Sequence, residues 1–256
     1  MISIDSFQRT LCTGLLLAGA LAPQAQAAGV AGQGTWETSL QARDLDGNVA
    51  NGAEAYYDSA LNITWLADAF QAQTSGYQPH PVYGPGNPLV WSLALEWADQ
   101  LVLYGIDDWR LPRAFDTGAP GCTNLLQGGE CGSNVDPASS ELAHMFHVTL
   151  GNVSYLSPQG TLAPGSGLTN TGSFSNVYNG RYWSETDYDY FNAWNFDVNF
   201  GTQRETDKGQ MSAVWAVLDG DRGTPLSPVP EPGSWALMLA GATALLARAR
   251  RRAART

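Results

Sequence analysis

The last 28 residues, 229–256, are the feature that most constrains what this chain can become. They contain Val229-Pro230-Glu231-Pro232, then an uncharged apolar run that ends at Ala247, then a cluster of arginines, Arg248, Arg250, Arg251, Arg252 and Arg255. A helix satisfies its own backbone hydrogen bonds, so an uncharged apolar helix here would partition into a bilayer. We therefore expect a transmembrane helix over residues 233–247, with the arginines held in the cytoplasm by the positive-inside bias.

The apolar run is short for a membrane span. With Pro232 included it has roughly 16 residues, or about 24 Å as a helix, whereas a bilayer usually needs roughly 20 residues. Arginine side chains can supply the remainder because their stems extend along apolar surface to the interface. The alternative is a buried helix followed by a basic tail.

The order of these three parts is similar to the PEP-CTERM sorting signal of exopolysaccharide-producing Gram-negative bacteria. The resemblance implies recognition by an exosortase, a membrane protease that would cut near Val229-Pro230-Glu231-Pro232. It therefore implies the exosortase and the inner membrane as partners of this chain.

The other end of the chain has the features of a secretory signal peptide. An apolar run from Leu11 to Leu21 is too short to span a membrane, and the small-residue pattern Ala25-Gln26-Ala27 follows it. We expect a signal peptide over residues 1–27, cut between Ala27 and Ala28 after export through the Sec translocon. The body of the protein would then be anchored to the inner membrane with its domain in the periplasm. It would reach the cell surface or the extracellular matrix after processing.

The body between the two end signals is strongly acidic. Residues 28–228 contain seven Lys and Arg against 22 Asp and Glu, a net charge of −15. Such a surface repels nucleic acid and anionic polysaccharide, so we exclude nucleic acid as a partner. The many glycines and aromatic residues favour a folded, loop-rich domain over an acidic disordered segment, which would lack aromatics.

Two cysteines remain once the signal peptide is removed, because Cys12 lies within it. Cys122 and Cys131 are separated by a glycine-rich stretch, and in an oxidising compartment they most simply pair with each other. A metal site would need further Cys or His at ligand spacing, and none is nearby.

The pattern of apolar residues predicts a mixed α+β domain. Apolar residues at helical spacing indicate two amphipathic helices, with Ser92 as the N-cap of the first and Ser139 or Ser140 capping the second. Alternating runs in the C-terminal third indicate an antiparallel meander. The expected helices cover residues 90–103 and 141–148, and the expected strands cover 36–40, 56–58, 62–66, 181–184, 193–200 and 212–218. The two runs at 56–58 and 62–66 have the pattern of a hairpin. Trp109 and Leu111 alternate inward before Pro112, as expected of a structural corner.

One predicted strand carries a row of polar side chains. In residues 193–200, apolar side chains alternate with Asn195, Asp197 and Asn199. We expect this polar row on the solvent face, where it could bind sugar hydroxyls or an ion. An ordinary solvated face is the alternative reading.

Two groups of residues resemble metal ligands without matching a metal site. Asp44, Asp46 and Asn48 alternate as oxygen ligands for calcium would, but the glycine spacing and the missing glutamate favour an ordinary Asp-Gly turn. His144 and His147 share a helix face, but they lack the spacing of a zinc site and are better read as core or surface residues. We assign no metal and no cofactor, with calcium as the alternative.

A set of short motifs is spread over most of the mature chain, residues 56–221. They are Tyr56-Tyr57-Asp58, Thr64-Trp65-Leu66, Trp91 through Ala98, Asp108-Trp109-Arg110-Leu111-Pro112, Glu141 through Phe146, Tyr182-Trp183-Ser184-Glu185, Ala193 through Phe196 and Val214-Trp215-Ala216-Val217. Together they resemble the Lcl C-terminal domain, long described as a domain of unknown function. This resemblance implies a compact C-type lectin-like fold with two helices and a twisted antiparallel sheet, preceded by a lead-in over 28–55 and followed by a linker over 222–228.

Members of that family are bacterial surface or exported proteins, and the collagen-like namesake is an adhesin that binds sulfated glycosaminoglycan. The family has no established catalytic residues, so the resemblance transfers none to this chain. We expect an exported surface or matrix protein whose domain is not an enzyme and binds an extracellular polysaccharide or another envelope component.

Two alternatives remain open. One is a secreted hydrolase that cleaves glycans with two carboxyl groups across a cleft, one of them with a raised pKa. The other is a purely structural matrix subunit. The carboxylates available for hydrolysis are Asp107, Asp108, Glu185, Asp187 and Asp189.

Overall fold

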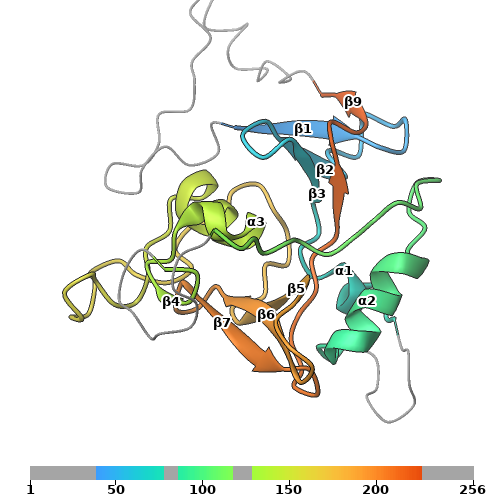
Figure 1. Ribbon diagram of the computed structural model, residues 1–256. Coiled ribbons are helices and arrows are strands. Elements are labelled where there is room, and N and C mark those ends of the chain that lie inside the picture. The colour runs from blue at the N-terminus through green and yellow to red at the C-terminus, as the bar shows by residue number, and fades with distance from the viewer. Residues whose placement is uncertain (1–38, 78–85, 118–128, 227–256) are drawn as a thin grey trace, which may run out of the picture.

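The structure is a computed structural model, and it describes residues 39–77, 86–117 and 129–226 (Figure 1). No helix within these ranges is long and apolar enough to cross a membrane. Several predictions lie outside the described residues, namely the signal cleavage at Ala27 and Ala28, the Val229-Pro230-Glu231-Pro232 motif, the helix over 233–247, the five arginines and Cys122.

The described chain is α+β with antiparallel sheets, which confirms the predicted class at that level. The first sheet has five strands in the order β8-β3-β2-β1-β9. The predicted hairpin is present in it, since Tyr56 pairs with Trp65 and Asp58 with Ile63. The strands are β1 (Leu40–Asp44), β2 (Ala55–Asp58), β3 (Ile63–Leu66), β8 (Val217–Asp219) and β9 (Thr224–Pro225).

The folded unit extends beyond both ends of residues 56–221. Strand β1 lies in the predicted lead-in, and it pairs along its length with β2. Strand β9 follows Asp221 and pairs with β1. The sheet is therefore completed by residues on either side of the stretch that carries the Lcl motifs.

The second sheet has four strands in the order β4-β7-β6-β5. Its strands are β4 (Gly132–Ser133), β5 (Arg181–Asp187), β6 (Asn192–Asp197) and β7 (Thr202–Asp207). The meander was predicted with residues 212–218 as its third strand, and this prediction is wrong. The strand beside β6 is β7, whose sequence Thr-Gln-Arg-Glu-Thr-Asp has no apolar alternation to reveal it.

Residues 212–218 instead connect the two sheets. Ala213 bridges Tyr182 of β5 in parallel, and Val217 then pairs with Trp65 of β3. Because residues 213–218 are all apolar, this segment can be buried from both sides while it passes from one sheet to the other.

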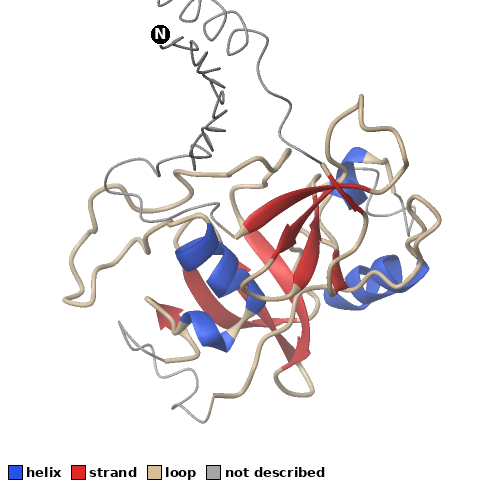
Figure 2. Ribbon diagram, turned by 90° about the horizontal axis from the view of Figure 1, so that it is seen from above, coloured by secondary structure: helices blue, strands red, loops and turns tan. Residues whose placement is uncertain are grey.

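The helices lie on opposite sides of the strands (Figures 1 and 2). Helix α2 (Trp91–Gln100) starts without a side-chain cap, so the prediction that Ser92 caps it is wrong. Helix α3 (Glu141–His144) is capped as predicted, because Ser140 Oγ accepts a hydrogen bond from the Ala143 amide at 2.9 Å. It continues as a π-helical turn over Met145–Thr149. A short helix, α1 (Gln71–Thr74), and a 3₁₀ turn over Pro137–Ser139 complete the described helices.

Aromatic residues fill the core between the sheets. The Trp215 ring lies 4.9 Å from Trp65, 4.7 Å from Phe174 and 5.7 Å from Tyr182, measured between ring centroids. Its indole N–H donates to the Leu66 carbonyl at 2.8 Å. This bond spares the buried Trp215 indole the desolvation cost of an unpaired N–H.

Candidate functional site

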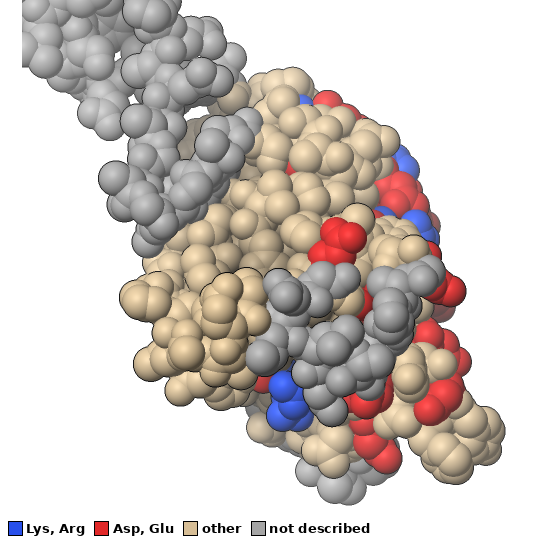
Figure 3. Space-filling model, turned by 60° about the vertical axis from the view of Figure 1, so that its left-hand side comes forward, with Lys and Arg blue, Asp and Glu red and all other residues tan. Residues whose placement is uncertain are grey.

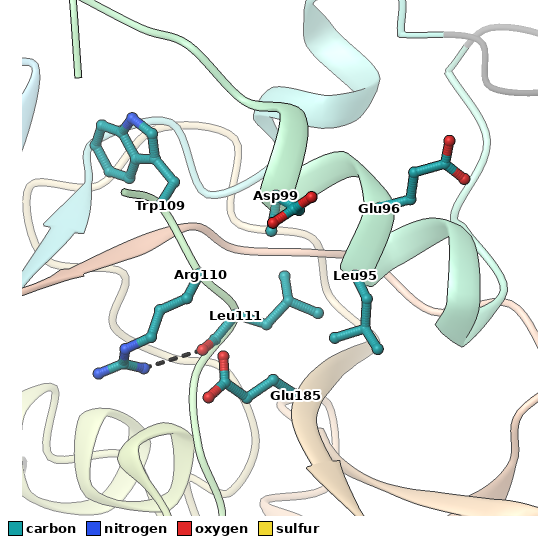
Figure 4. Close-up of a pocket in the computed structure, with 8 residues that line it drawn as sticks. Leu95, Glu96, Asp99, Trp109, Arg110, Leu111 and Glu185 are labelled. Carbon is teal, nitrogen blue, oxygen red and sulfur yellow. Dashed lines mark hydrogen bonds between the residues drawn. The ribbon is translucent and has the colours of Figure 1, made fainter. Parts of the chain in front are cut away.

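A cleft opens between α2, strand β5 and the segment that precedes Pro112. It has a volume of about 450 Å³ and is lined by Leu95, Glu96, Ala98, Asp99, Trp109, Arg110, Leu111 and Glu185. Figure 4 shows Leu95 and Asp99 projecting from α2 on one side and Glu185 projecting from β5 on the other, while Glu96 points away from Glu185 at the rim.

The segment that precedes Pro112 forms one wall of the cleft, and it adopts the structural corner that the sequence predicts. Trp109 and Leu111 are buried, as their alternation predicts. Arg110 points the other way and donates to both carboxylate oxygens of Glu141 at 2.8 Å, and to Asp219 at 2.7 Å and 3.0 Å. It also donates to the Leu111 carbonyl at 2.9 Å. These bonds use all five N–H groups of the guanidinium, so Arg110 has no donor left for a ligand.

The charged residues of this corner shift each other's pKa values. Burial alone would lower the pKa of Arg110, but its hydrogen bonds to Glu141 and Asp219 and the charges of these two residues raise it above its ordinary value. Hydrogen bonding from Arg110 is the main cause that lowers the pKa of Asp219. The corner is therefore a fixed set of ion pairs.

The carboxylates of the cleft make fewer hydrogen bonds than Arg110 does. Glu185 accepts from Arg113 Nε at 2.6 Å. Glu96 accepts one bond, from Gln100 at 3.1 Å, and Asp99 makes no hydrogen bond or ion pair within the described residues. The cleft thus presents carboxylates that can still accept hydrogen bonds. The face in Figure 3 likewise shows acidic side chains outnumbering basic ones.

A second feature is the turn between β5 and β6, which we call the aromatic tip and define as Tyr188, Tyr190 and Phe191. Tyr190 is 86% exposed and Phe191 67% exposed, and their rings meet edge to face at 4.8 Å. Tyr188 packs in the same way on Trp194 at 5.1 Å. Large aromatic side chains exposed together in this manner usually mark a binding surface.

The aromatic tip is fixed by polar contacts. Asp189 accepts from the amides of Phe191 and Asn192 at 2.8 Å and 2.7 Å, which closes the turn. Bonding to Asn192 also lowers the pKa of Asp189 below its usual value. Lys208 donates to the Asp189 carbonyl at 2.8 Å and lies 2.6 Å from Asp187. The rings are therefore presented on a braced turn.

The structure corrects the expectation for the polar row of β6. Asn195 and Asp197 are only 1% and 5% exposed, so they do not lie on a solvent face. Both faces of β6 are covered because the second sheet packs in the interior. Asp197 and Asn199 do line a small hollow of about 240 Å³ with Arg181, which lies 3.5 Å from Asp197. Asn195 does not line it, and its side-chain amide has no hydrogen-bond partner within the part of the chain that the structure describes.

The loop that carries Asp44, Asp46 and Asn48 forms a turn, and the third residue beside Asp44 and Asp46 is Glu54 instead of Asn48. Ligand atoms of Asp44, Asp46 and Glu54 lie within 4.8 Å of one another. Asp44 accepts from the amides of Asp46 and Gly47 at 3.1 Å and 2.7 Å, as in the favoured Asp-Gly turn. Glu54 accepts from the Leu45 amide at 3.0 Å. This triad could supply oxygen ligands to a cation, but its contacts are those of a closed turn.

His144 and His147 make their contacts within the fold. Burial lowers the pKa of His147 to about 4, and its Nδ1 lies 3.2 Å from the Asn152 carbonyl. Burial also lowers the pKa of His144, whose Nδ1 lies 3.3 Å from Thr149 Oγ1. That hydroxyl donates to the buried Asp58 at 2.8 Å. Thr149 is itself buried, so the chain of contacts links α3 to β2 and exposes no nucleophile.

Of the two cysteines that were predicted to pair, only Cys131 lies within the described residues. Cys131 is disulfide-bonded and buried beside Ala114 and Trp194. Its pairing with Cys122 stays a prediction, because Cys122 lies outside the described residues.

The five carboxylates considered for hydrolysis are not gathered in the cleft. Glu185 lines it, and Asp107, Asp108, Asp187 and Asp189 do not. Asp108 pairs with Arg222, and Asp187 pairs with Lys208. Within the cleft, Glu185 is held by Arg113 and Asp99 is exposed to solvent.

Sequence reasoning named Glu185 but missed Glu96 and Asp99 of the cleft and the aromatic tip. Glu96 and Asp99 are spaced i, i+3 on α2, a spacing that could have marked them as neighbours. That they line the same cleft as Glu185, far along the chain, had no local signal. The aromatic tip could have been found, because three aromatic residues in a four-residue turn are unusual for an exposed loop.

No known family model matches this chain, and no curated protein is significantly similar to it.

Proposed function

We propose that this chain is an exported, non-catalytic binding domain for extracellular polysaccharide, and that the aromatic tip is its principal contact. The observation that carries the proposal is the exposure of Tyr190 and Phe191 on a turn braced by Asp189 and Lys208. Because the turn is already ordered, binding would cost little conformational entropy.

The chemistry of the tip suits sugars. Aromatic faces pack against the C–H face of a pyranose ring, and this contact needs no charge on the glycan. Carboxylate and amide groups of Asp189 and Asn192 flank the rings and can meet hydroxyls. The acidic body disfavours polyanionic glycans, which leaves neutral or cationic polysaccharides as ligands.

The location of this activity is part of the proposal and is supported by both ends of the sequence. Export through the Sec translocon would deliver the domain to the periplasm, and the 233–247 helix would anchor it to the inner membrane. An exosortase would then release or transfer it to the surface or matrix of a Gram-negative cell. A C-type lectin-like arrangement also belongs to the proposal, supported by the Lcl motifs.

A retention assay tests the glycan proposal. The mature body, residues 28–228, would be passed over immobilised exopolysaccharide and over a glycan array. The variant carrying Tyr190→Ala and Phe191→Ala should bind more weakly by about fivefold or more, because each aromatic contact contributes about 0.5–1.5 kcal/mol.

The matched control is Tyr104→Ala, since Tyr104 is another exposed aromatic, 45% accessible, outside the tip. It should bind as the unchanged protein does. Equal binding by the tip variant, or no retention of the unchanged protein on any glycan, would overturn the proposal.

A further inference from the structure

We propose that the hollow at one end of the second sheet is a second glycan site, which binds one uncharged sugar unit through its hydroxyl groups. This inference rests on the proposed function for the class of ligand. It adds a site at which hydrogen bonds to hydroxyls, instead of aromatic contacts, provide the affinity. The hollow has a volume of about 240 Å³ and is lined by Tyr178, Gly180, Arg181, Asp197, Asn199 and Met211.

Two oppositely charged side chains lie beside each other in the hollow. Arg181 of β5 and Asp197 of β6 are directly paired residues of adjacent strands, so their side chains are on the same face of the sheet. Arg181 Nε lies 3.5 Å from Asp197 Oδ2, and no hydrogen bond joins these two atoms. The hollow therefore contains a cationic donor and an anionic acceptor that are close together but incompletely engaged.

The polar side chains of the hollow have hydrogen-bonding capacity left. The guanidinium of Arg181, the carboxamide of Asn199 and the hydroxyl of Tyr178 make no hydrogen bond within the described ranges. Asp197 Oδ1 accepts from the Asn199 amide at 3.0 Å, whereas Oδ2 accepts no hydrogen bond from any described residue. Asp197 is only 5% exposed, and buried polar atoms normally have a hydrogen-bond partner. Its Oδ2 is therefore available to a donor that enters the hollow.

The walls of the hollow are held in place by contacts outside it. The Val198 amide donates to the Gly180 carbonyl at 2.9 Å, which joins the two segments that form the hollow. The Tyr178 ring stacks on Phe70 with 5.1 Å between centroids, and the Tyr178 amide donates to the Tyr182 hydroxyl at 2.6 Å. Because these walls are already ordered, a ligand would not have to pay for arranging them.

The charges of the hollow favour an uncharged ligand. Arg181 and Asp197 are the only charged residues of its lining, so the lining has no net charge. An anionic group would be repelled by Asp197 and a cationic group by Arg181. A hydroxyl group is both a donor and an acceptor, so it can accept from Arg181 while it donates to Asp197. An adjacent hydroxyl of the same sugar ring can bind the Asn199 carboxamide.

The size of the hollow limits the ligand to a small group. Sites for drug-sized ligands have volumes of roughly 300–1,000 Å³. The hollow is smaller, at about 240 Å³, which suits one sugar unit of a chain. Met211 supplies an apolar surface for the C–H groups of that unit, and it is partly exposed.

The hollow and the aromatic tip lie at opposite ends of β6. The tip comes directly before Asn192, where β6 begins, and Asp197 is the last residue of β6. A six-residue strand is about 20 Å long, so the two sites share no contact. Substitutions at such a separation usually have independent effects, which allows each site to be tested by itself.

The test measures the affinity of the full chain for neutral hexamers by titration calorimetry. The probes are β-1,4-linked hexamers of glucose, mannose and galactose, and the fully O-methylated form of each, which keeps the sugar rings and loses every hydroxyl donor. We expect at least one free hexamer to bind, and to bind more tightly than its methylated form by about threefold or more.

Arg181→Gln and Asn199→Ala each remove a hydrogen-bonding group from the hollow. Each should weaken binding of the free hexamer by about threefold to tenfold and leave the methylated hexamer unchanged. Arg204→Gln is the matched control, because it removes the same charge from an exposed position of the same sheet that does not line the hollow. It should alter neither affinity. Near-ultraviolet circular dichroism would confirm that all three variants are folded.

The outcomes separate the two proposals. A free hexamer weakened by the tip substitutions but by neither hollow variant would overturn the second site and leave binding at the tip intact. A hexamer weakened by the hollow variants but not by the tip substitutions would support the hollow and overturn the tip as the principal contact. A sulfated glucose hexamer that binds through Arg181 more tightly than the neutral one would overturn the preference for uncharged sugars. Failure of every hexamer and of the glycan array would overturn both proposals.

Discussion

Single residues of this protein owe their properties to burial more than to their type. His147 illustrates this, because an exposed histidine would titrate near 6.5 whereas burial lowers its pKa to about 4. Its Nε2 has no hydrogen-bond partner among the described residues, and its ring meets the Phe146 and Phe196 rings at 4.9 Å and 5.8 Å. A proton on this ring would have to be stabilised among aromatic side chains.

This burial predicts a dependence of stability on pH. The unfolded chain binds a proton at His147 near the ordinary pKa, and the folded chain binds it only near 4, so stability is unaffected above about pH 6.5 and is lost as the pH falls toward 4. Between about pH 7 and about pH 5 the loss should be about 2 kcal/mol. Urea unfolding of the unchanged protein and of His147→Phe at both pH values measures it. The variant should lose clearly less, and parallel losses in the two proteins would contradict the argument.

At the scale of elements, the β6–β7 hairpin shows how a turn is fitted to its neighbours. Gly201 has a φ of +62°, and a Cβ placed on it would lie 2.6 Å from Phe146 Cε1 and 2.8 Å from Ser154 Cα. Ser154 also donates to the Gly201 carbonyl at 2.6 Å. The turn therefore needs glycine for two reasons, its backbone conformation and the closeness of the π-helical turn.

Gly201→Ala should lower the free energy of unfolding by about 2–4 kcal/mol, which combines left-handed strain with overpacking against Phe146. Gly220→Ala is the matched control, because Gly220 has a φ of +76° and nothing within 4 Å of its position for a Cβ. It should cost only the strain, about 1–2 kcal/mol. Chemical denaturation of both variants measures the difference, and equal losses would show that the contact with Phe146 is relieved by a small shift.

At the scale of the whole molecule, Trp215 joins the two sheets. It contacts Trp65 of β3 in the first sheet and Tyr182 of β5 in the second, and it donates to the Leu66 carbonyl. Because one buried side chain serves both sheets, we expect them to fold as one cooperative unit.

Trp215→Ala should cost about 3–5 kcal/mol, which is a large part of the stability of an ordinary domain. Denaturation followed by tryptophan fluorescence and by far-ultraviolet circular dichroism should still give coincident transitions at a lower midpoint. Phe200→Ala, which removes a partly exposed aromatic at the surface, should shift the midpoint much less. Separate transitions for the two signals would contradict the single unit.

Local patterns were sufficient for several elements of the fold. The β2–β3 hairpin, the cap at Ser140 and the inward alternation of Trp109 and Leu111 depend on near neighbours in the chain, so the sequence predicted them. Strand β7 carries only polar residues, and its pairing with β6 comes from its place in the sheet. No periodicity could reveal it.

The sequence by itself determined the class of the domain, its acidic charge and the residues that fill its core, because these follow from composition and short-range periodicity. Only the tertiary structure decided that Asn195 and Asp197 are buried, that residues 212–218 join the two sheets, and that Asp99 faces a cleft shared with Glu185. Each of these depends on which distant segment packs against a given face, and packing between segments far apart in the chain has no local signature.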